Sequence, residues 1–294
     1  MSDVLVLERP ARLGSVMRDY LALSKSRIVM MVLITTAAGY LFGAKHVDWM
    51  LLLNTLLGTA LVAAGTNALN QYIERDYDAK MRRTRLRPLP DGRIAPRAAL
   101  VFSIAISILG TLYLGFAVNW LTAALGAFTL ITYIFIYTPL KRLSAICTLI
   151  GAIPGAIPPL MGWTAATGVL GTGGWIIFAI LFFWQLPHFM AISWMYRDDY
   201  ARGGFAMLAV QDDDGRTTAR HAVFYSFALL TVSVLPPLFG LSTFVYLAGA
   251  VIAGGALTFA SFAFLASRTP VRARRLFMAS NIYLVVMMAL LILA

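Results

Sequence analysis

Three side chains that carry oxygen, Asn70, Glu74 and Asp78, recur at every fourth position of the stretch NALNQYIERDYD. On an α-helix this spacing places them within about 40° of one face and over about 12 Å of the axis. Carboxylates spaced in this way repel each other unless a cation lies between them. An amide and two carboxylates are hard oxygen ligands that suit Mg²⁺, which commonly bridges carboxylates to substrate phosphates. The spacing predicts a magnesium site, with a solvated, charged helix end as the alternative.

The residues that follow this stretch are strongly basic. Guanidinium groups bind phosphate oxygens in pairs, so a run of arginines beside a magnesium site indicates a phosphate ligand. Two more basic residues, Lys141 and Arg142, lie in a very short stretch between apolar runs. They are either part of a diphosphate site or anchors whose charged ends reach the membrane surface. The arginines of the first run are Arg82, Arg83, Arg85 and Arg87.

A second polar segment, WQLPHFMAISWMYRDDYARGG at 184–204, closes another apolar run. Asp198 and Asp199 lie there between Arg197 and Arg202. One of these acids can complete the metal site from a neighbouring helix, or the group is an ordinary charged helix end. The sequence favours neither reading by itself. The three aspartates at 212–214 lack helical spacing and indicate a solvated loop.

His188 follows Pro187 about one turn inside the same apolar run. A histidine at such a position is costly in a membrane unless it has a partner. It binds a substrate or a haem iron, or it is a structural residue bonded to a backbone carbonyl. The single cysteine, Cys147, excludes an intrachain disulfide framework and a thiolate metal site, and we interpret it as a core residue.

The elements that position these residues are predicted to be membrane-spanning helices. The chain of 294 residues is 60% hydrophobic and 13% charged, whereas soluble domains carry about 25% charged residues. Its length suits roughly nine helices of about 20 residues with short connections. The nine apolar windows are 28–44, 50–73, 98–116, 119–138, 145–164, 174–195, 221–240, 244–266 and 276–294.

The charges are arranged asymmetrically along these windows. Of the 24 lysines and arginines, all but Lys45 fall in five segments that share one side of a nine-helix protein, and of the 13 acids all but Asp48 do the same. The positive-inside rule places that side, with the N-terminus, in the cytoplasm and the C-terminus opposite. The net charge of +11 is thereby explained without nucleic acid as a partner. We expect a polar tail at 1–26 with an interfacial helix near 13–23, and a single transmembrane domain at 27–294.

Several motifs together resemble a known family. Asn70, Glu74 and Asp78 resemble the N-x-x-x-D-x-x-x-D signature of the UbiA superfamily of intramembrane prenyltransferases, and Arg82 to Pro88 is similar to its R-x-T-x-x-R-P run. Within that superfamily the resemblance is to the branch that farnesylates protohaem IX, the haem O synthases, and it extends from residue 24 to about 208. The stretches that carry it are SKSRI at 24–28, YTPLKR at 137–142, GAIPGAIPPLMGW at 151–163, WQLPHF at 184–189 and RDDYARGG at 197–204.

One motif departs from the superfamily pattern. Many members carry D-x-x-x-D in the second acidic segment, but here Tyr196 and Tyr200 stand at those places, with Asp199 between them. Asp199 is therefore the acid that the resemblance assigns to the metal site. The departure leaves the number of metal ions open.

The resemblance implies an all-α bundle of nine transmembrane helices around a central cavity, with Mg²⁺ held by Asn70, Glu74, Asp78 and Asp199. The implied substrates are farnesyl diphosphate and haem b, and His188 is the expected haem-binding residue. Membrane lipid surrounds the bundle, and haem A synthase or oxidase assembly proteins are expected partners. The expected diphosphate ligands, among which Arg27 and Lys141 are favoured, are Arg27, Arg82, Arg83, Arg87, Lys141, Arg142, Arg197 and Arg202.

Three other readings of the sequence remain. A related prenyltransferase would act on another aromatic acceptor such as 4-hydroxybenzoate. A cation-coupled transporter would carry its acids near the middle of the bilayer and an inverted repeat, which the sequence does not show. A haem-binding assembly protein would form no product. No import signal is apparent near the N-terminus, which favours the bacterial plasma membrane over the mitochondrial inner membrane.

Overall fold

The computed structural model describes residues 13–293, and all regular elements in this range are helices. Nine of these helical segments are long and apolar enough to cross a membrane, as the sequence predicts. The chain is an integral, multi-pass membrane protein. The spans are α2 (Ser26–Gly43), α3 (Trp49–Asp78), α4 (Pro96–Ala117), α5 (Trp120–Ile131) with the π-helical turn η1 (Thr132–Tyr137) and α6 (Thr138–Leu140), α7 (Cys147–Thr167), α8 (Thr172–Met195), α11 (Arg216–Ser233) with α12 (Leu235–Leu238), α13 (Phe244–Ala266) and α14 (Pro270–Ile292).

Three helices extend five or more residues beyond their apolar windows, among them α11, which begins at Arg216 instead of residue 221. α3 continues to Asp78, well past residue 73, so its last turns carry Glu74 and Asp78. α14 begins at Pro270 instead of residue 276, because Thr269 caps it and proline suits the first helical turn. Hydropathy locates the part of a helix that lies in lipid, whereas backbone hydrogen bonds continue into the polar region until a cap ends them.

α7 lies inside the bundle, packed against α2, α3, α5 and α8. It approaches α2 so closely that glycine is required on both helices. A Cβ atom on Gly162 would lie 1.9 Å from the carbonyl oxygen of Thr36, and one on Gly39 would lie 1.9 Å from that of Pro159. Small residues at helix crossings are the usual route to close packing in membranes. This contact fixes the position of α2, and with it the turn at Lys25 that directly precedes α2.

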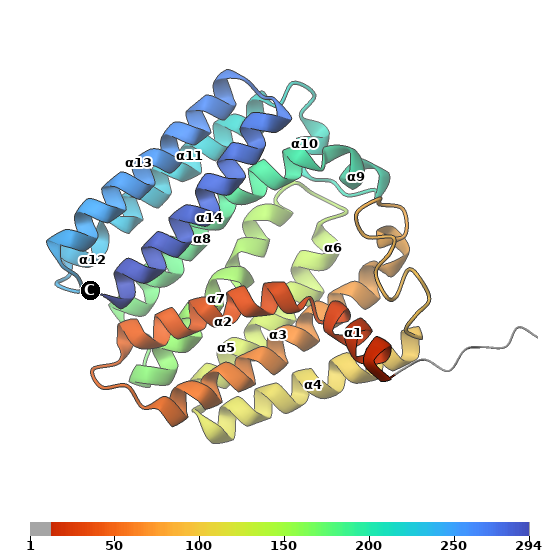
Figure 1. Ribbon diagram of the computed structural model, residues 1–294, viewed down its shortest axis with the longest axis horizontal. Coiled ribbons are helices and arrows are strands. Elements are labelled where there is room, and N and C mark those ends of the chain that lie inside the picture. Colours follow the sequence, from red (N-terminus) through yellow and green to blue (C-terminus); the bar gives the residue numbers. More distant parts are fainter. Residues whose placement is uncertain (1–12, 294) are drawn as a thin grey trace, which may run out of the picture.

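The polar segments gather at one end of the bundle. Figure 1 shows α1 (Leu13–Leu23), the connection from α3 to α4, α9 (Arg197–Arg202) and α10 (Leu208–Gln211) at this end, with α12 and the C-terminal end of α14 at the other. Residues 1–12 of the expected polar tail lie outside the described residues. The backbone N–H of Ala206 donates to the carbonyl oxygen of Lys141 at 2.8 Å, which ties the α9–α10 segment to the turn after α6.

The α2–α7 crossing provides a test of the fold. We expect Gly162→Ala to lower the free energy of unfolding by about 1–3 kcal/mol, because the added methyl group meets backbone and not a flexible side chain. Thermal unfolding of the purified protein in detergent measures the change. The matched control is Gly255→Ala, since a Cβ atom at Gly255 meets nothing within 4 Å. Equal melting temperatures for the two variants would contradict the close approach.

Candidate functional site

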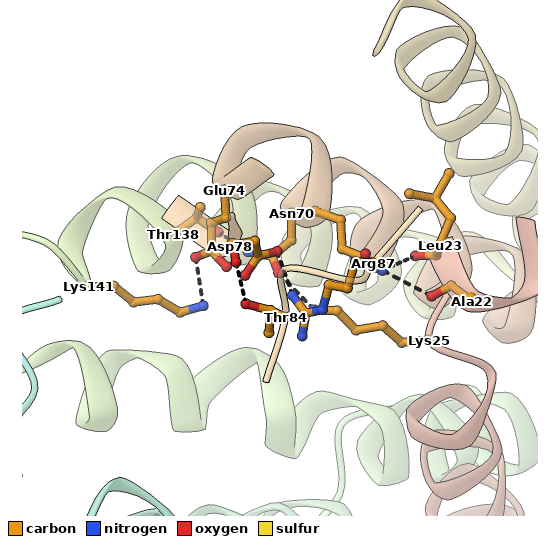
Figure 2. Close-up of polar contacts among 11 residues, drawn as sticks. Ala22, Leu23, Lys25, Asn70, Glu74, Asp78, Thr84, Arg87, Thr138 and Lys141 are labelled. Atoms are coloured by element: carbon orange, nitrogen blue, oxygen red, sulfur yellow. Dashed lines mark hydrogen bonds and ion pairs between the residues drawn. The ribbon is translucent and has the colours of Figure 1, made fainter. Parts of the chain in front are cut away.

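The centre of the candidate site is one face of α3. Asn70, Glu74 and Asp78 lie along it one turn apart and are 0%, 6% and 1% exposed. Figure 2 shows their side chains directed toward the same space beside α3. Two carboxylates and an amide are therefore held in protein and not in bulk water. A buried carboxylate is costly unless a positive charge and hydrogen bonds compensate for the lost water.

Each of the three side chains meets its own cation. Lys25 donates to Asn70 Oδ1 at 2.8 Å, and Lys141 donates to Glu74 Oε1 at 2.8 Å. Arg87 Nη1 lies 2.6 Å from Asp78 Oδ2. The three cations come from the α1–α2 turn, the turn after α6 and the α3–α4 connection (Figure 2). The face thus attracts positive charge from three distant parts of the chain.

The two lysines differ in their protonation. Burial disfavours the charged form of Lys141, but its contact with Glu74 outweighs this and holds the pKa of the ammonium well above the usual value. Burial lowers the pKa of Lys25 to about 7, and the nearby charges of Arg87 and Lys141 act in the same direction. Lys141 is therefore charged at neutral pH.

Local structure explains how these side chains reach α3. Lys25 has φ 51°, a left-handed conformation that is uncommon for a residue other than glycine, at the turn between α1 and α2. Gln71 steadies that turn, because its Nε2 donates to the carbonyl oxygens of Ala22 and Leu23 at 3.1 and 2.6 Å. The strained turn directs Lys25 at the site.

The segment after η1 supplies a second support. Thr138 accepts a hydrogen bond from Asn70 Nδ2 at 3.2 Å and donates to the carbonyl oxygen of Tyr133 at 2.8 Å. π-Helical turns inside α-helices are frequent at functional sites. Three residues later Lys141 reaches Glu74, with its ammonium 4.5 Å from the ring centroid of Tyr137. One short segment therefore orients the amide and neutralises a carboxylate.

The α3–α4 connection folds back on the end of α3. Thr84 Oγ1 donates to the carbonyl oxygen of Asp78 at 2.8 Å, which occupies an acceptor left free at the helix end. This fold brings Arg87 back to the side chain of Asp78, nine residues earlier. The arginine run in the sequence therefore contributes one guanidinium to the α3 face. Arg82, Arg83 and Arg85 are exposed instead.

Asp199 forms a separate contact at the same end of the bundle. Its carboxylate accepts from the backbone N–H groups of Arg82 and Arg83 at 3.2 and 3.3 Å and also pairs with Arg202. Burial works against ionisation of this carboxyl, but these hydrogen bonds outweigh it and lower its pKa below the usual value. The structure thus places Asp199 as a link between α9 and the α3–α4 connection. It makes no hydrogen bond to Asn70 or the two α3 acids in the described chain.

The remaining predicted basic residues form no hydrogen bond or ion pair with Asn70, Glu74 or Asp78 among the described residues. The Arg142 guanidinium is 4.3 Å from the ring centroid of Tyr77, and that of Arg197 is 4.7 Å from that of Trp194. Arg27 is exposed and forms no hydrogen bond or ion pair in the part of the chain that the structure describes. The structure therefore brings Lys25 to the α3 face, whereas the resemblance favoured Arg27.

Lys25, Thr138 and Gln71 are residues that sequence reasoning missed. Lys25 and Thr138 lie 45 and 68 residues from Asn70, so no local spacing connects them to it. Lys25 lies in the SKSRI stretch that carries the resemblance, and this was the one available signal. Thr138 and Gln71 are uncharged and gave none.

The oxygen atoms of Asn70, Glu74 and Asp78 are suitable ligands for a hard divalent cation. One amide and two carboxylates provide oxygen ligands only, and the lysine and arginine groups that meet them already compensate negative charge there. Between residues 13 and 293 no three His, Cys, Asp or Glu side chains lie close enough together to form a metal site by themselves. An ion at the α3 face would therefore need further oxygen ligands, which diphosphate and water provide.

His188 lies away from these charges, on α8 beside α14. Its Nδ1 is 2.8 Å from Ser280 Oγ, and its ring centroid lies 4.9 Å from those of Trp184 and Phe277. The partner of His188 is thus a side-chain hydroxyl, not the backbone carbonyl that the structural alternative expected. The ring is held between two aromatic side chains.

Comparison with known proteins decides the family. Residues 32–285 match the UbiA prenyltransferase family. The chain belongs to this family. Two bacterial relatives are both called protoheme IX farnesyltransferase. The one from Solibacter usitatus is 47% identical, and the match covers 94% of this chain and 98% of the relative. The one from Koribacter versatilis is 44% identical, and the match covers 100% of this chain and 98% of the relative. A human mitochondrial relative of the same name is 38% identical and covers 92% of this chain and 60% of that protein.

Solved structures show the same UbiA fold. A structure described as digeranylgeranylglyceryl phosphate synthase superposes with a TM-score of 0.80 at 18% identity and covers 94% of this chain and 97% of that one. A UbiA homologue from Archaeoglobus fulgidus, bound to GPP and Mg²⁺, superposes with a TM-score of 0.69 at 15% identity and covers 93% and 99%. At these identities the likeness establishes the fold alone.

The Asp199 contact generates a prediction about the α3–α4 connection. We expect Asp199→Asn to increase hydrogen exchange at the amides of Arg82 and Arg83, because an amide side chain accepts more weakly than a carboxylate and offers one oxygen. The expected loss of local stability is about 1–3 kcal/mol. Hydrogen exchange in detergent, followed by mass spectrometry of the peptide covering 79–95, measures it.

Asp198→Asn is the matched control, since Asp198 is exposed and forms no hydrogen bond or ion pair among the described residues.

The lowered pKa of Asp199 also sets the pH dependence of this protection from hydrogen exchange. The contact is complete above the unfolded-state pKa of about 3.9 and is lost as pH falls through the lower folded-state value. Loss of protection already between pH 7 and 5 would contradict this assignment.

Proposed function

We propose that this protein transfers the farnesyl group of farnesyl diphosphate to a vinyl group of protohaem IX (haem b). The products are haem O, after addition of water, and diphosphate. The observation that carries this proposal is the likeness to proteins called protoheme IX farnesyltransferase, at 47% and 44% identity over nearly the whole of each chain. The buried oxygen face of α3, with cations gathered from three segments, supports the same chemistry because a diphosphate needs positive charge around it.

We assign Mg²⁺ to the face formed by Asn70, Glu74 and Asp78, with Asp199 as the fourth candidate ligand. The homologue bound to GPP and Mg²⁺ has the same fold, which supports a divalent ion in this family. Asp199 must give up its backbone hydrogen bonds to Arg82 and Arg83 to take that role. When bound, the ion supplies positive charge where negative charge develops on the leaving diphosphate.

The basic side chains of the site bind the diphosphate in this proposal. Lys25, Lys141 and Arg87 already lie against α3 and can exchange carboxylate or amide contacts for phosphate oxygens. Binding of an anion stabilises the charged form of Lys25, whose pKa is about 7 without it. These three residues come first among the candidates. The others are Arg27, Arg82, Arg83, Arg142, Arg197 and Arg202.

The organic step follows from the departure of diphosphate. Cleavage of the allylic C–O bond leaves a farnesyl cation and diphosphate. The first farnesyl carbon bonds to the haem vinyl group, which moves the positive charge to the other vinyl carbon, and water adds there and releases a proton to give the hydroxyl. The rings of Tyr133 and Tyr137, which contact each other in η1 just before Thr138, are proposed to stabilise this cation through their faces. His188 orients the haem as a ligand of its iron.

The remaining proposals concern the cell. We place the protein in a bacterial plasma membrane with the N-terminus and active site in the cytoplasm and the C-terminus opposite, as the lysine and arginine distribution favours. Residues 27–294 form one transmembrane domain, and α1 lies along the membrane surface. Haem A synthase or oxidase assembly proteins are the proposed partners.

Removal of either α3 acid tests the metal assignment. We expect Glu74→Ala and Asp78→Ala to reduce turnover at least about 100-fold, because each removes an oxygen ligand and frees a cation beside the site. Asp76→Ala is the matched control, since its side chain is 75% exposed and, among residues 13–293, pairs only with Arg75. Initial rates at saturating Mg²⁺ and the yield of folded membrane protein are both measured. Near-normal rates in both acid variants would overturn the assignment.

Chelation and product mass test the reaction itself. Purified protein given farnesyl diphosphate and haem b should form haem with the mass of an added farnesyl group and water. EDTA should stop the reaction, and Mg²⁺ should restore it, because the α3 oxygens then lose their divalent ion. If the protein prenylated 4-hydroxybenzoate and not haem b, it would be a prenyltransferase that acts on another aromatic acceptor. Absence of any prenylated product would support a transporter or an assembly protein.

A further inference from the structure

One polar cluster of the bundle has no part in diphosphate chemistry. It joins α8 to α14, far from the charged end of α3 in sequence. Ser280 is its centre: its Oγ lies 2.8 Å from His188 Nδ1, and its carbonyl oxygen accepts from Trp184 Nε1 at 2.6 Å. Trp184 and His188 are one helical turn apart, so both side chains of α8 meet the same residue of α14. Ser280 itself is completely buried.

The proton positions in this cluster follow from its donors and acceptors. Ser280 Oγ lies 2.7 Å from the carbonyl oxygen of Phe277, which can only accept. The single hydroxyl proton of Ser280 is therefore donated to Phe277, and Oγ faces His188 with a lone pair. His188 Nδ1 must then carry the proton. The opposite assignment would leave two lone pairs facing each other at 2.7 Å.

The consequence appears at the other ring nitrogen. A neutral imidazole has one N–H and one bare nitrogen, so a proton on Nδ1 leaves Nε2 with a free lone pair. Nε2 has no hydrogen-bond partner among residues 13–293. The aromatic rings of Trp184 and Phe277, each with its centroid 4.9 Å from that of the imidazole, hold the ring from turning. The cluster thus presents an oriented, unprotonated nitrogen.

We infer that Ser280 is a positioning residue, which fixes the Nδ1–H tautomer of His188 so that Nε2 is directed as the ligand for the iron of the haem substrate. This inference rests on the proposed function. Histidines that bind metals usually donate their other N–H to an outer partner, which sets the tautomer and raises ligand basicity. Here that outer partner comes from α14, 92 residues away, and is itself held by Phe277 and Trp184.

His188 lies at a depth along α8 similar to that of Asn70 along α3. His188 lies seven residues before Met195, the end of α8, which corresponds to about 10 Å along the axis. Asn70 lies eight residues before Asp78, the end of α3, or about 12 Å. Both helices end at the polar end of the bundle (Figure 1). A haem held at His188 and a diphosphate held at α3 therefore lie at similar depths.

The first experiment reads the tautomer without substrate. The full-length protein is labelled with ¹⁵N on its three histidines, and His188→Gln assigns the His188 resonances. Two-bond ¹H–¹⁵N correlations should show the proton on Nδ1 and a bare Nε2. Ser280→Ala should shift the proton distribution toward Nε2, and Ser280→Thr should restore Nδ1–H because it retains the hydroxyl. A proton on Nε2 in the wild-type protein, or no change in Ser280→Ala, overturns the inference.

The matched control is Ser226→Ala. Ser226 is also buried and donates to a backbone carbonyl one turn earlier, at 2.8 Å, but its other partner is Ser261 and not a histidine. This variant should leave the His188 resonances unchanged. If it altered them as much as Ser280→Ala does, the effect of Ser280 would be general packing and the inference would fall.

The second experiment reads the iron. Titration with ferric haem b should give a histidine-ligated absorption spectrum that His188→Ala removes, and Ser280→Ala should raise the dissociation constant about 10- to 100-fold. An unchanged spectrum in His188→Ala overturns the iron contact. The product assay separates this outcome from failure of the proposed function. Farnesylated haem with the other tautomer overturns the inference alone, whereas the stated tautomer without prenylated product overturns the proposed function.

Discussion

Charge compensation at the buried face of α3 is the interaction on which the site depends. Two carboxylates and an amide lie out of contact with bulk water, and each meets a cation delivered by a different segment. Leaving either carboxylate unpaired would cost several kcal/mol, so the segments that carry Lys141 and Arg87 are bound to α3 by electrostatics. The same contacts gather positive charge where a diphosphate would lie. In the proposed function, one set of groups therefore serves both stability and ligand recognition.

The backbone provides the precision that these contacts need. Lys25 reaches the site from a strained turn that Gln71 holds, and Lys141 reaches it from a segment set by a π-helical turn. α2 is in turn fixed against α7 by glycines that allow their backbones to approach closely. In lipid, where apolar surface gains little from association, such close packing and interhelical hydrogen bonds orient the helices. The site is thus assembled from rigid helix ends.

Two further polar clusters have different physical roles. At the polar end, Asp199 joins α9 to the α3–α4 connection through backbone amides, so the loop that carries Arg87 depends on a second acidic segment. Within the bundle, Ser280 joins α14 to α8 through His188 and Trp184. In the function proposed above, the first cluster supports the loop beside the phosphate site, whereas the second directs a neutral nitrogen toward the haem iron.

Composition and spacing were sufficient to predict the nine spans and the common face of Asn70, Glu74 and Asp78. They also predicted that the arginine run after this face contributes positive charge to it, as Arg87 does. These are local properties, because the 3.6-residue period and hydropathy act over neighbouring residues. The end of α3 and the starts of α11 and α14 were misplaced by five or six residues, since caps and not hydropathy end a helix. Lys25, Thr138 and Ser280, and the separate position of Asp199, were decided by tertiary structure. Their partners lie 45 to 117 residues away, and only helix packing brings such residues within hydrogen-bonding distance.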